Sequence, residues 1–253
     1  MSLTYCIFSR DERMMKIKEL LENEGNKVFI HTKDEYKGAD VLILPVPLST
    51  DGVHIRDCDL EIEELRDFKG KVLGGLVPDK YDFIEDYFKN DEVEIANAVP
   101  TAEGAVEIAL RETKTTLMNT TVLITGFGRI SKILSKILKG FDCKIKIAAR
   151  NKSQLAYIKA LGFEPADIYN MPTDCDVLIN TVPAPVINKS YIEKLKKDVV
   201  IIDLASKPGG CDFNECEKRG IKAIHALSLP SKCAPVTAGE ILYNSIKSFN
   251  LKG

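Results

Sequence analysis

A glycine-rich turn carries the clearest chemical signal in this sequence. Residues 125–131 read Thr-Gly-Phe-Gly-Arg-Ile-Ser, directly after the apolar run Thr121–Thr125 and before a segment with helical periodicity. Gly126 would make the tight turn, and Gly128 would let a pyrophosphate approach the N-terminus of the helix. A glycine turn between a strand and a helix predicts a dinucleotide site. We assign this site to Gly126, Phe127, Gly128, Arg129 and Ile130.

The end of the next expected strand, Lys144–Ala149, bears on which dinucleotide is bound. An NAD site usually places Asp or Glu about 20 residues after the glycine turn, but this sequence has Arg150-Asn151-Lys152 there. A carboxylate would repel a 2′-phosphate, whereas Arg150 can pair with it and Lys152 adds a second positive charge. We predict NADP rather than NAD, bound by Arg150, Asn151 and Lys152. The alternative is that Arg150 is a solvated strand end.

Three other turns follow expected strands and could face a ligand. In an open parallel sheet, ligands lie beyond the carboxyl ends of the strands. The two turns in the second half of the chain supply Thr181-Val182-Pro183 and Leu204-Ala205 to the nicotinamide side of the site. In the first half, Ser49 and Thr50 offer hydroxyl donors that suit a carboxylate, next to an expected cleft between two domains.

Composition limits the classes of function. The chain has 253 residues, of which 45% are hydrophobic and 28% charged, and a net charge of -2, which predicts one or two folded domains. There is no basic excess for nucleic acid, and the apolar runs are far shorter than the roughly 20 residues of a membrane span. The first residues do not resemble a secretory signal. We expect a cytoplasmic protein with neither a nucleic-acid nor a membrane partner.

The cysteines and histidines suggest no metal centre. Seven scattered cysteines without a Cys-x-x-Cys motif predict reduced thiols and no structural disulfides. Cys211 and Cys216 lie close in sequence, but no histidine pair at zinc spacing accompanies them, so we interpret them as buried or inert thiols. His225 ends an apolar stretch and could be a catalytic base or an imidazole at the edge of the core.

The elements that must position these residues alternate in the manner of βαβ units. This pattern predicts an α/β fold with two Rossmann-like, doubly wound parallel-sheet domains and a cleft between them. Residues 1–100, completed by a C-terminal helix over 237–250, form the expected substrate domain. Residues 101–236 form the expected NADP-binding domain, with a linker helix over 101–112. The first turn, Ser9-Arg10-Asp11, lacks glycine, which is why the first domain is assigned to the substrate.

Individual elements follow from the two periodicities. Strands are expected at residues 5–8, 27–31, 41–45, 71–77, 94–98, 121–125, 144–149, 176–180, 199–204 and 222–225. Helices are expected at residues 11–23, 81–88, 101–112, 129–139, 153–160, 189–195, 214–219 and 237–249.

Three segments together resemble one enzyme family. They are Asn97-Ala98-Val99-Pro100-Thr101-Ala102-Glu103-Gly104, Ile202-Asp203-Leu204-Ala205-Ser206-Lys207-Pro208-Gly209-Gly210 and Ala234-Pro235-Val236-Thr237-Ala238-Gly239-Glu240. With the glycine turn they resemble the A subunits of dipicolinate synthase. The resemblance implies a sporulation enzyme of the mother-cell cytoplasm that oxidises a dihydrodipicolinate-type dicarboxylate with NADP. It also implies a partner, the flavoprotein-like B subunit.

The resemblance further implies which residues meet the substrate. Lys207 and Lys232 would lie in loops where either could clamp a carboxylate, and Thr101, Ser49 and Thr50 would add hydroxyl contacts. Glu103 is the candidate proton acceptor; the alternative is a solvated carboxylate in the first turn of a helix. The sequence departs from the family in its short start, in Ser231 where the family usually has glycine, and in a compressed loop after Ser49.

Two other functions remain open from sequence. A dehydrogenase of the 2-hydroxyacid type would need a histidine paired with a carboxylate, for which His225 is the one plausible base. A non-catalytic subunit that only binds a dinucleotide is the second alternative. A homo-oligomer is compatible with either interpretation.

Overall fold

The chain divides into two compact units, which are described separately. A computed structural model describes residues 2–32 and 34–251. Unit 1 comprises Met1–Asn97 and Ala234–Gly253, and unit 2 comprises Ala98–Cys233; the sequence analysis put these boundaries after residues 100 and 236. Over the described residues, none of the helices has both the length and the apolar composition that a membrane span needs.

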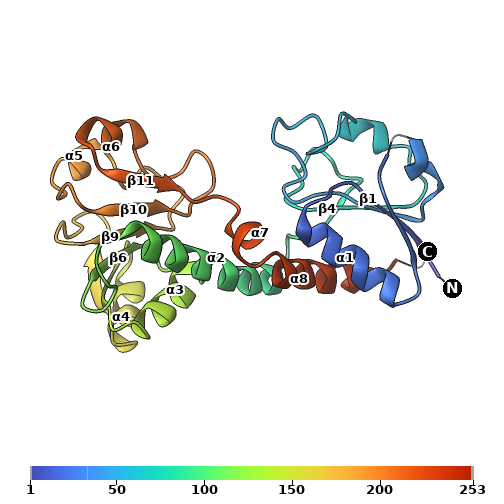
Figure 1. The fold of residues 1–253 in the computed structure, drawn as a ribbon. Helices are drawn as coiled ribbons and strands as arrows, with labels where there is room; N and C mark the ends of the chain where they lie inside the picture. The colour runs from blue at the N-terminus through green and yellow to red at the C-terminus, as the bar shows by residue number, and fades with distance from the viewer. Residues whose placement is uncertain (1, 33, 252–253) are drawn as a thin grey trace. The chain divides into compact units, whose positions relative to one another are not determined.

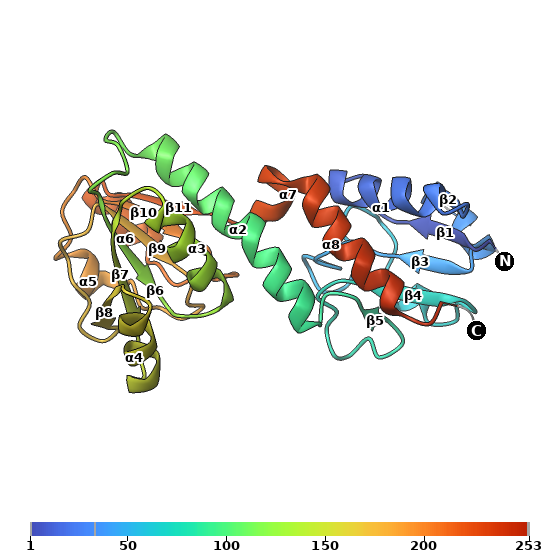
Figure 2. The same ribbon diagram turned by 90° about the horizontal axis from the view of Figure 1, so that it is seen from below.

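Unit 1, where Figure 1 labels β1 and β4, is built on a five-stranded parallel sheet. Its strand order is β2-β1-β3-β4-β5, and Figure 2 labels all of these strands. The strands are β1 (Thr4–Ile7), β2 (Lys27–Ile30), β3 (Val41–Ile43), β4 (Lys71–Gly74) and β5 (Glu85–Asp86). The helices are α1 (Glu12–Asn23) and α8 (Pro235–Ser248), with short 3-10 turns η1 (Asp34–Gly38) and η2 (Ile62–Leu65).

Alternation along the strands gives unit 1 a core on each face of its sheet. Tyr5 and Ile7 pack with side chains of α1 and α8, whereas Cys6 and Phe8 pack with η2 and the loops of the opposite face. The helices α1 and α8 lie side by side in Figure 2. They come from opposite ends of the chain, so the C-terminal segment covers the first sheet.

Unit 2 is built on a six-stranded parallel sheet with the order β11-β10-β9-β6-β7-β8. Its strands are β6 (Thr121–Thr125), β7 (Lys144–Ala149), β8 (Glu164–Asp167), β9 (Val177–Asn180), β10 (Val200–Asp203) and β11 (Lys222–His225). Helix α2 (Asp91–Glu112) belongs to unit 2 from Ala98 onward. The other helices of this unit are α3 (Arg129–Lys139), α4 (Lys152–Ala160), α5 (Lys189–Ile192), α6 (Phe213–Arg219) and α7 (Leu229–Cys233). This is the strand order of a dinucleotide-binding fold, in which the order reverses between β6 and β9.

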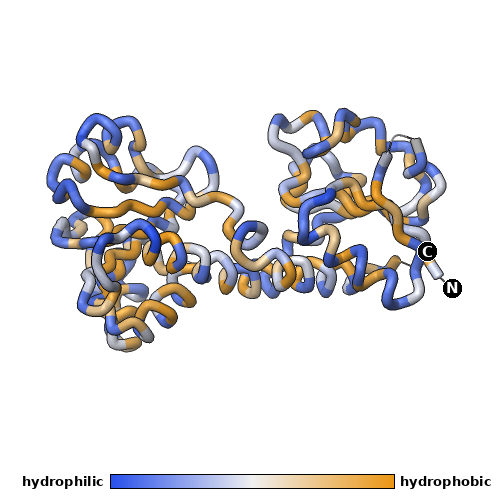
Figure 3. Tube along the Cα trace, in the orientation of Figure 1, coloured by the Kyte–Doolittle hydropathy of each residue, from blue (hydrophilic) through white to orange (hydrophobic). Residues whose placement is uncertain are grey.

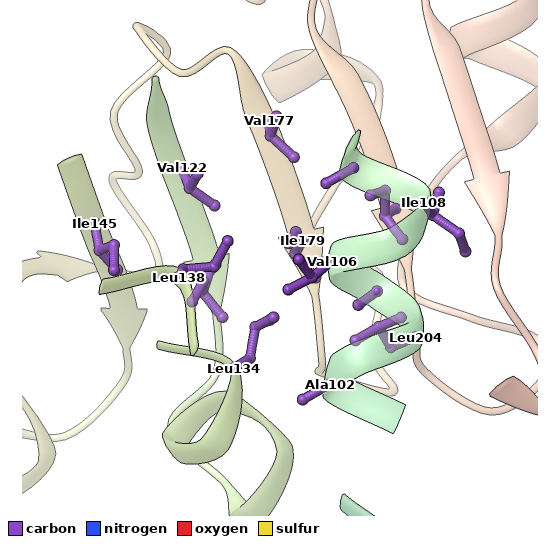
Figure 4. Packing of buried hydrophobic residues seen from close by; sticks show 14 of the residues in the cluster. Ala102, Val106, Ile108, Val122, Leu134, Leu138, Ile145, Val177, Ile179 and Leu204 are labelled. Carbon is purple, nitrogen blue, oxygen red and sulfur yellow. The ribbon is translucent and has the colours of Figure 1, made fainter. Parts of the chain in front are cut away.

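The central strands β6, β9 and β10 of unit 2 are buried on both faces of the sheet, and their traces are mostly hydrophobic in Figure 3. On one face Val122, Val177 and Ile179 meet α2 and α3, where Figure 4 shows Leu134 and Val106 directed toward the strands. On the other face Leu178 and Ile201 meet α5 and α6. The two layers fix the strand ends in register.

Two predicted elements differ in the structure, and one observed strand was missed. Residues 94–98 are helical rather than a strand, because the buried Ala98, Ala102 and Ala105 of α2 share a helical face that continues past Pro100. Residues 81–88 form turns and β5 rather than a helix. There the Asp86 carboxylate accepts from the amides of Leu76, Val77, Phe88 and Lys89, which competes with helical bonding. Strand β8 was not predicted; its acidic, proline-containing sequence suits only an edge strand.

Candidate functional site at the strand ends of unit 2

Four polar side chains stand in one register row at the carboxyl ends of neighbouring strands. Thr125 of β6 pairs with Asn180 of β9, which pairs with Asp203 of β10, which pairs with His225 of β11. The Thr125 hydroxyl donates to Asn180 Oδ1, and Asn180 Nδ2 donates to Asp203 Oδ1 at 2.7 Å. Thr125, Asn180 and Asp203 have no exposed surface. A buried hydrogen-bonded chain therefore runs along the edge where a ligand binds in this fold.

The Asp203 carboxylate holds the loop that follows β10. Its Oδ1 also accepts from the amide of Ala205 at 3.0 Å, and its Oδ2 accepts from the amides of Gly210 at 2.7 Å and Cys211 at 3.1 Å. A Cβ at Gly210 would lie 2.4 Å from Asn180 Nδ2, so only glycine fits there. The loop 205–211 is thus fixed at both ends, while Ser206, Lys207 and Pro208 between them are exposed.

His225 is attached to the same loop. Its Nε2 lies 2.9 Å from the carbonyl oxygen of Ala205, and its ring stacks on Phe213 with centroids 5.2 Å apart. A carbonyl oxygen can only accept, so this bond requires the proton on Nε2 and leaves the lone pair of the neutral ring on Nδ1. His225 is thus a half-buried imidazole with one nitrogen committed to the backbone.

The glycine turn has the geometry of a dinucleotide-binding turn. Gly126 has a φ of 89°, and a Cβ there would lie 2.6 Å from Thr181 Oγ1 and 2.9 Å from Val182 Cγ2. The Thr181 hydroxyl donates to the carbonyl of Thr125 at 2.7 Å, which holds the two turns together. Gly126 and Thr181 therefore lie against each other at the point where the strand order reverses, between β6 and β9. Both residues were assigned to the cofactor from sequence.

The start of α3 fits a pyrophosphate. Its N-cap is Gly128, whose missing side chain cannot accept from the first amides of the helix, and a Cβ at this position would meet open space. The first turn of α3 contains no acidic residue. An N-cap without a side chain, the positive end of the helix dipole and open space suit an anionic diphosphate, and the buried Phe127 anchors the turn in the core.

The residues assigned to the 2′-phosphate follow β7, next to the glycine turn. Arg150 and Lys152 are exposed, and their positive charges come where an NAD site has a carboxylate. Asn151 has a structural role that the sequence analysis did not foresee: its Oδ1 caps α4 by accepting from the amide of Gln154 at 2.7 Å. Only its amide nitrogen remains for a ligand.

The other residues assigned to unit 2 separate into two groups. Val182, Pro183, Leu204, Ala205 and Lys207 all belong to turns at the carboxyl ends of β9 and β10. Thr101 and Glu103 belong to α2, and the exposed Lys232 belongs to α7. Glu103 lines a groove of about 510 Å³ between α2 and α3, together with Glu107, Arg111 and Phe141. The structure thus places Glu103 beside α3, whereas Lys207 stands in the strand-end loop.

The turn assigned to the substrate in unit 1 is occupied by its own hydrogen bonds. Ser49 donates to Asp51 Oδ1 at 2.9 Å and accepts from the amide of Gly52 at 2.9 Å. The same aspartate accepts from His54 Nδ1, and this bond raises the pKa of the His54 imidazole. The Ser49 hydroxyl proton is committed within the turn, and the nearby carboxylate of Asp51 opposes an anion; Thr50 is exposed.

A cavity in unit 1 is lined by an exposed cationic side chain, that of Arg10. This cavity of about 330 Å³ opens beyond β1 and β2, lined by Phe8, Ser9, Arg10, Asp11, Ile30, His31 and Asp57. Asp11 pairs with both Arg13 and Arg56 at 2.8 Å, whereas Arg10 is exposed and forms no ion pair within the described part of the chain. From sequence, the missing glycine in this turn assigned the first domain to the substrate, but Arg10 was not named as a site residue.

The sequence analysis named the strands but missed the polar row of Thr125, Asn180 and Asp203 as a site feature. One signal was available: each strand of buried aliphatic residues ends in a single polar side chain. Over the described residues, no group of three or more His, Cys, Asp or Glu side chains could hold a metal ion.

Comparisons with known proteins agree with this geometry. Residues 98–207 match the family described as D-isomer specific 2-hydroxyacid dehydrogenase, NAD binding domain. The A subunit of dipicolinate synthase from Bacillus subtilis (strain 168) is 36% identical over 160 residues, which cover 62% of this chain and 54% of that protein. The chain thus spans about half the length of this relative.

Solved structures extend the likeness to the whole chain. The A subunit of dipicolinate synthase from Bacillus halodurans matches 97% of this chain and 96% of its own, with a TM-score of 0.86 and 28% sequence identity. The apo-structure of D-lactate dehydrogenase from Escherichia coli covers 97% of this chain and 95% of its own, with a TM-score of 0.66. At 14% identity, that second likeness concerns the fold alone.

The fold and the strand-end site define a dinucleotide-binding subunit of the dehydrogenase type, with a nicotinamide dinucleotide as its cofactor. The predicted α/β class with Rossmann-like parallel sheets is confirmed. Within this class the chain is similar to the A subunit of dipicolinate synthase, and the resemblance predicted from its three sequence segments is confirmed.

Proposed function

We propose that the chain is the subunit of a dipicolinate synthase that oxidises a dihydrodipicolinate-type dicarboxylate with NADP in the cytoplasm of a sporulating mother cell. The observation that carries this proposal is the likeness along nearly all of both chains to the Bacillus halodurans protein, at a TM-score of 0.86. The D-lactate dehydrogenase likeness is lower, at 0.66. The proposal also includes a partner, the flavoprotein-like B subunit.

The chain's own residues would bind and orient the reactants. Gly126, Gly128 and the first amides of α3 would hold the pyrophosphate, and Arg150 and Lys152 the 2′-phosphate. When bound, NADP supplies the acceptor for a hydride from the substrate ring. Lys207 would neutralise a substrate carboxylate from the loop that Asp203 fixes, and Arg10 is a second candidate cation.

Loss of a hydride and a proton makes the ring aromatic, so a modest base is sufficient. The sequence assigned this proton to Glu103, which lies in the groove beside α3. We assign it instead to Nδ1 of His225, because Nε2 is committed to Ala205 and the ring belongs to the strand-end row. Asp203 and Asn180 would be positioning residues for the Lys207 loop.

The test is dipicolinate formation by the purified chain. Dihydrodipicolinate is generated in place from pyruvate and aspartate semialdehyde, with NADP or NAD, and with or without the B subunit. We expect NADP reduction that parallels dipicolinate accumulation and that Lys207→Ala lowers without weakening NADPH binding. If NADPH binds but dipicolinate never forms in any mixture, the proposed reaction is wrong.

The family match of unit 2 supports one alternative, the reduction of a 2-oxoacid by a 2-hydroxyacid dehydrogenase. The same protein is therefore assayed with pyruvate and NADH or NADPH. Turnover there, without dipicolinate formation, would replace the proposed reaction. Dinucleotide binding with no turnover of either substrate would instead indicate a non-catalytic binding subunit.

A further inference from the structure

The thiols of Cys211 and Cys216 are in contact at the end of the loop 205–211, which carries Lys207. The Sγ atoms of Cys211 and Cys216 are 3.6 Å apart and share a hydrogen bond. Cys211 is half-buried and ends the loop that Asp203 holds, whereas Cys216 is buried within α6. From sequence the two cysteines were interpreted as inert thiols, but the fold brings them into contact.

The backbone of each cysteine is held by hydrogen bonds. Cys211 donates its amide to Asp203 and forms an isolated bridge with Ile187, and the amide of Cys216 donates to the carbonyl of Asp212 at 3.1 Å. A disulfide bond is about 2.05 Å long, so the sulfur atoms must approach by only about 1.5 Å. Closure therefore requires rotation of both cysteine side chains and a small shift of Cys211 toward α6.

The pair also differs from the other thiols in acidity. The hydrogen bond from Cys211 lowers the pKa of Cys216, and the same contact raises the pKa of Cys211. Burial instead raises the pKa of both Cys6 and Cys175 to about 12. A thiolate is the nucleophile in thiol oxidation, so the lowered pKa of Cys216 supports reaction at this pair, whose sulfur atoms are already in contact.

We propose that Cys211 and Cys216 form a redox modification site that a peroxide closes to an intrachain disulfide. One thiolate attacks the O–O bond of the peroxide and gives a sulfenic acid and a hydroxide ion. The second sulfur then attacks the sulfenic sulfur, which forms the S–S bond and releases another hydroxide. The two thiol protons convert both hydroxides to water. Two thiols lose two electrons in total, and one hydrogen peroxide is reduced to two waters.

Closure acts on the strand-end site because Cys211 is one of the groups bound to Asp203. Its amide and that of Gly210 share Asp203 Oδ2, so a movement of Cys211 toward α6 disturbs Asp203, which also accepts from the amide of Ala205 in the turn assigned to the cofactor. We expect the disulfide to change the NADPH dissociation constant on the order of five-fold or more. This effect rests on the dinucleotide site and not on the identity of the substrate.

The experiment uses a convenient feature of the sequence. Trypsin does not cleave the Lys207-Pro208 bond, so one tryptic peptide, residues 198–218, carries both cysteines. The reduced full-length protein is treated with hydrogen peroxide, alkylated with N-ethylmaleimide and digested. The disulfide form lacks both alkyl groups and is two hydrogen atoms lighter than the dithiol peptide. Dithiothreitol before alkylation should restore two alkyl groups.

Matched variants decide the outcome. Cys211→Ser and Cys216→Ser should each abolish the light peptide, whereas Cys143→Ser, which changes a half-buried thiol elsewhere in unit 2, should not. If the peptide 198–218 still carries two alkyl groups after a peroxide treatment strong enough to oxidise Cys58 or Cys143, the proposed site is wrong. The proposed site is also wrong if the disulfide forms only in urea, because the folded protein is then not what brings the two sulfur atoms together. A fully closed protein with unchanged NADPH affinity would overturn the regulatory effect. Each of these readouts is independent of dipicolinate formation.

Discussion

Asn180 Nδ2 donates to Asp203 Oδ1 at 2.7 Å, across the carboxyl ends of the neighbouring strands β9 and β10. The amide oxygen of Asn180 accepts from the Thr125 hydroxyl, so one amide side chain joins three strands. The Asp203 carboxylate also accepts from backbone amides of the loop that follows β10. The dinucleotide turn after β6 and the Lys207 loop after β10 are therefore linked by buried side chains.

Asp203→Asn should destabilise unit 2 markedly. The carboxylate accepts from four donors, whereas an amide has one acceptor oxygen and would turn an NH₂ group toward the others. Each buried donor left without a partner costs about 1–3 kcal/mol, so we expect the free energy of unfolding to fall by about 2–4 kcal/mol in urea titrations. Asp198→Asn, an exposed control, should change it by less than about 0.5 kcal/mol. Equal stability of the two variants would contradict the network.

The two glycines of the cofactor turn should respond differently to alanine. Gly126→Ala combines a positive φ with a Cβ 2.6 Å from Thr181, and should cost about 1–3 kcal/mol of unfolding free energy. Gly220→Ala, with a φ of 68° and open space, controls for the backbone conformation alone and should cost less. Gly128→Ala should leave stability unchanged but weaken NADPH binding, because its methyl group occupies the space left for the pyrophosphate. Thermal unfolding with and without NADPH separates these effects.

The cofactor turn was predictable because its chemistry is local. The motif Gly126-Phe127-Gly128 and the strand before it lie within a few residues, so periodicity and backbone requirements are visible without a partner. The parallel α/β class followed from the same alternation of strands and helices. The linked side chains were not visible: Thr125 and Asn180 are 55 residues apart, and only the register between β6 and β9 brings them together.

Local competition explains the errors in unit 1. Residues 81–88 have an amphipathic pattern, but Asp86 takes four backbone amides from both sides of the turn, which no periodicity reveals. Similarly, Ser49 resembled a free hydroxyl donor until the structure showed its bond to Asp51. Residue types predict which groups could bind a ligand, whereas folding decides which of them are already bound to each other.

Arg150→Ala should reduce the preference for NADPH over NADH. Arg150 is the exposed cation that would pair with the 2′-phosphate, and a hydrogen bond between charged groups contributes about 1.5–3 kcal/mol. The dissociation constant of NADPH should rise on the order of ten- to a hundred-fold in fluorescence titrations, while that of NADH changes little. Lys159→Ala removes an exposed charge from the last turn of α4, the helix that follows Arg150, and serves as the control. Full retention of the preference would remove Arg150 from the site.

His225→Gln and Glu103→Gln distinguish the two candidate proton acceptors. Glutamine can still donate to Ala205 but has no basic nitrogen, so His225→Gln should lower kcat by about 10²- to 10⁴-fold with unchanged NADPH binding. Glu103→Gln should lower kcat less than about three-fold, because Glu103 lies in the groove beside α3. The reverse result would return the role to Glu103.

Asp11→Asn should remove part of the acid sensitivity of unit 1. Burial alone would raise the pKa of the Asp11 carboxyl, but the hydrogen bond from Arg13 and the charges of Arg13 and Arg56 outweigh it and lower this pKa. A carboxyl with a lowered pKa contributes stability above its unfolded value of about 3.9, and this contribution is lost as the pH falls through the folded pKa.

Wild type should therefore exceed Asp11→Asn by about 1–3 kcal/mol of unfolding free energy at pH 7, where the asparagine can still cap α1 through its side-chain oxygen. The difference should shrink as the pH falls below about 4, because protonated Asp11 no longer attracts the two guanidinium groups. Urea titrations at pH 7, 5 and 3 measure it. Asp79→Asn, at a side chain that is 97% exposed, should show a small difference at every pH. A gap between wild type and Asp11→Asn that stays constant down to pH 3 would mean that the ion pairs with Arg13 and Arg56 contribute nothing to the acid sensitivity of unit 1.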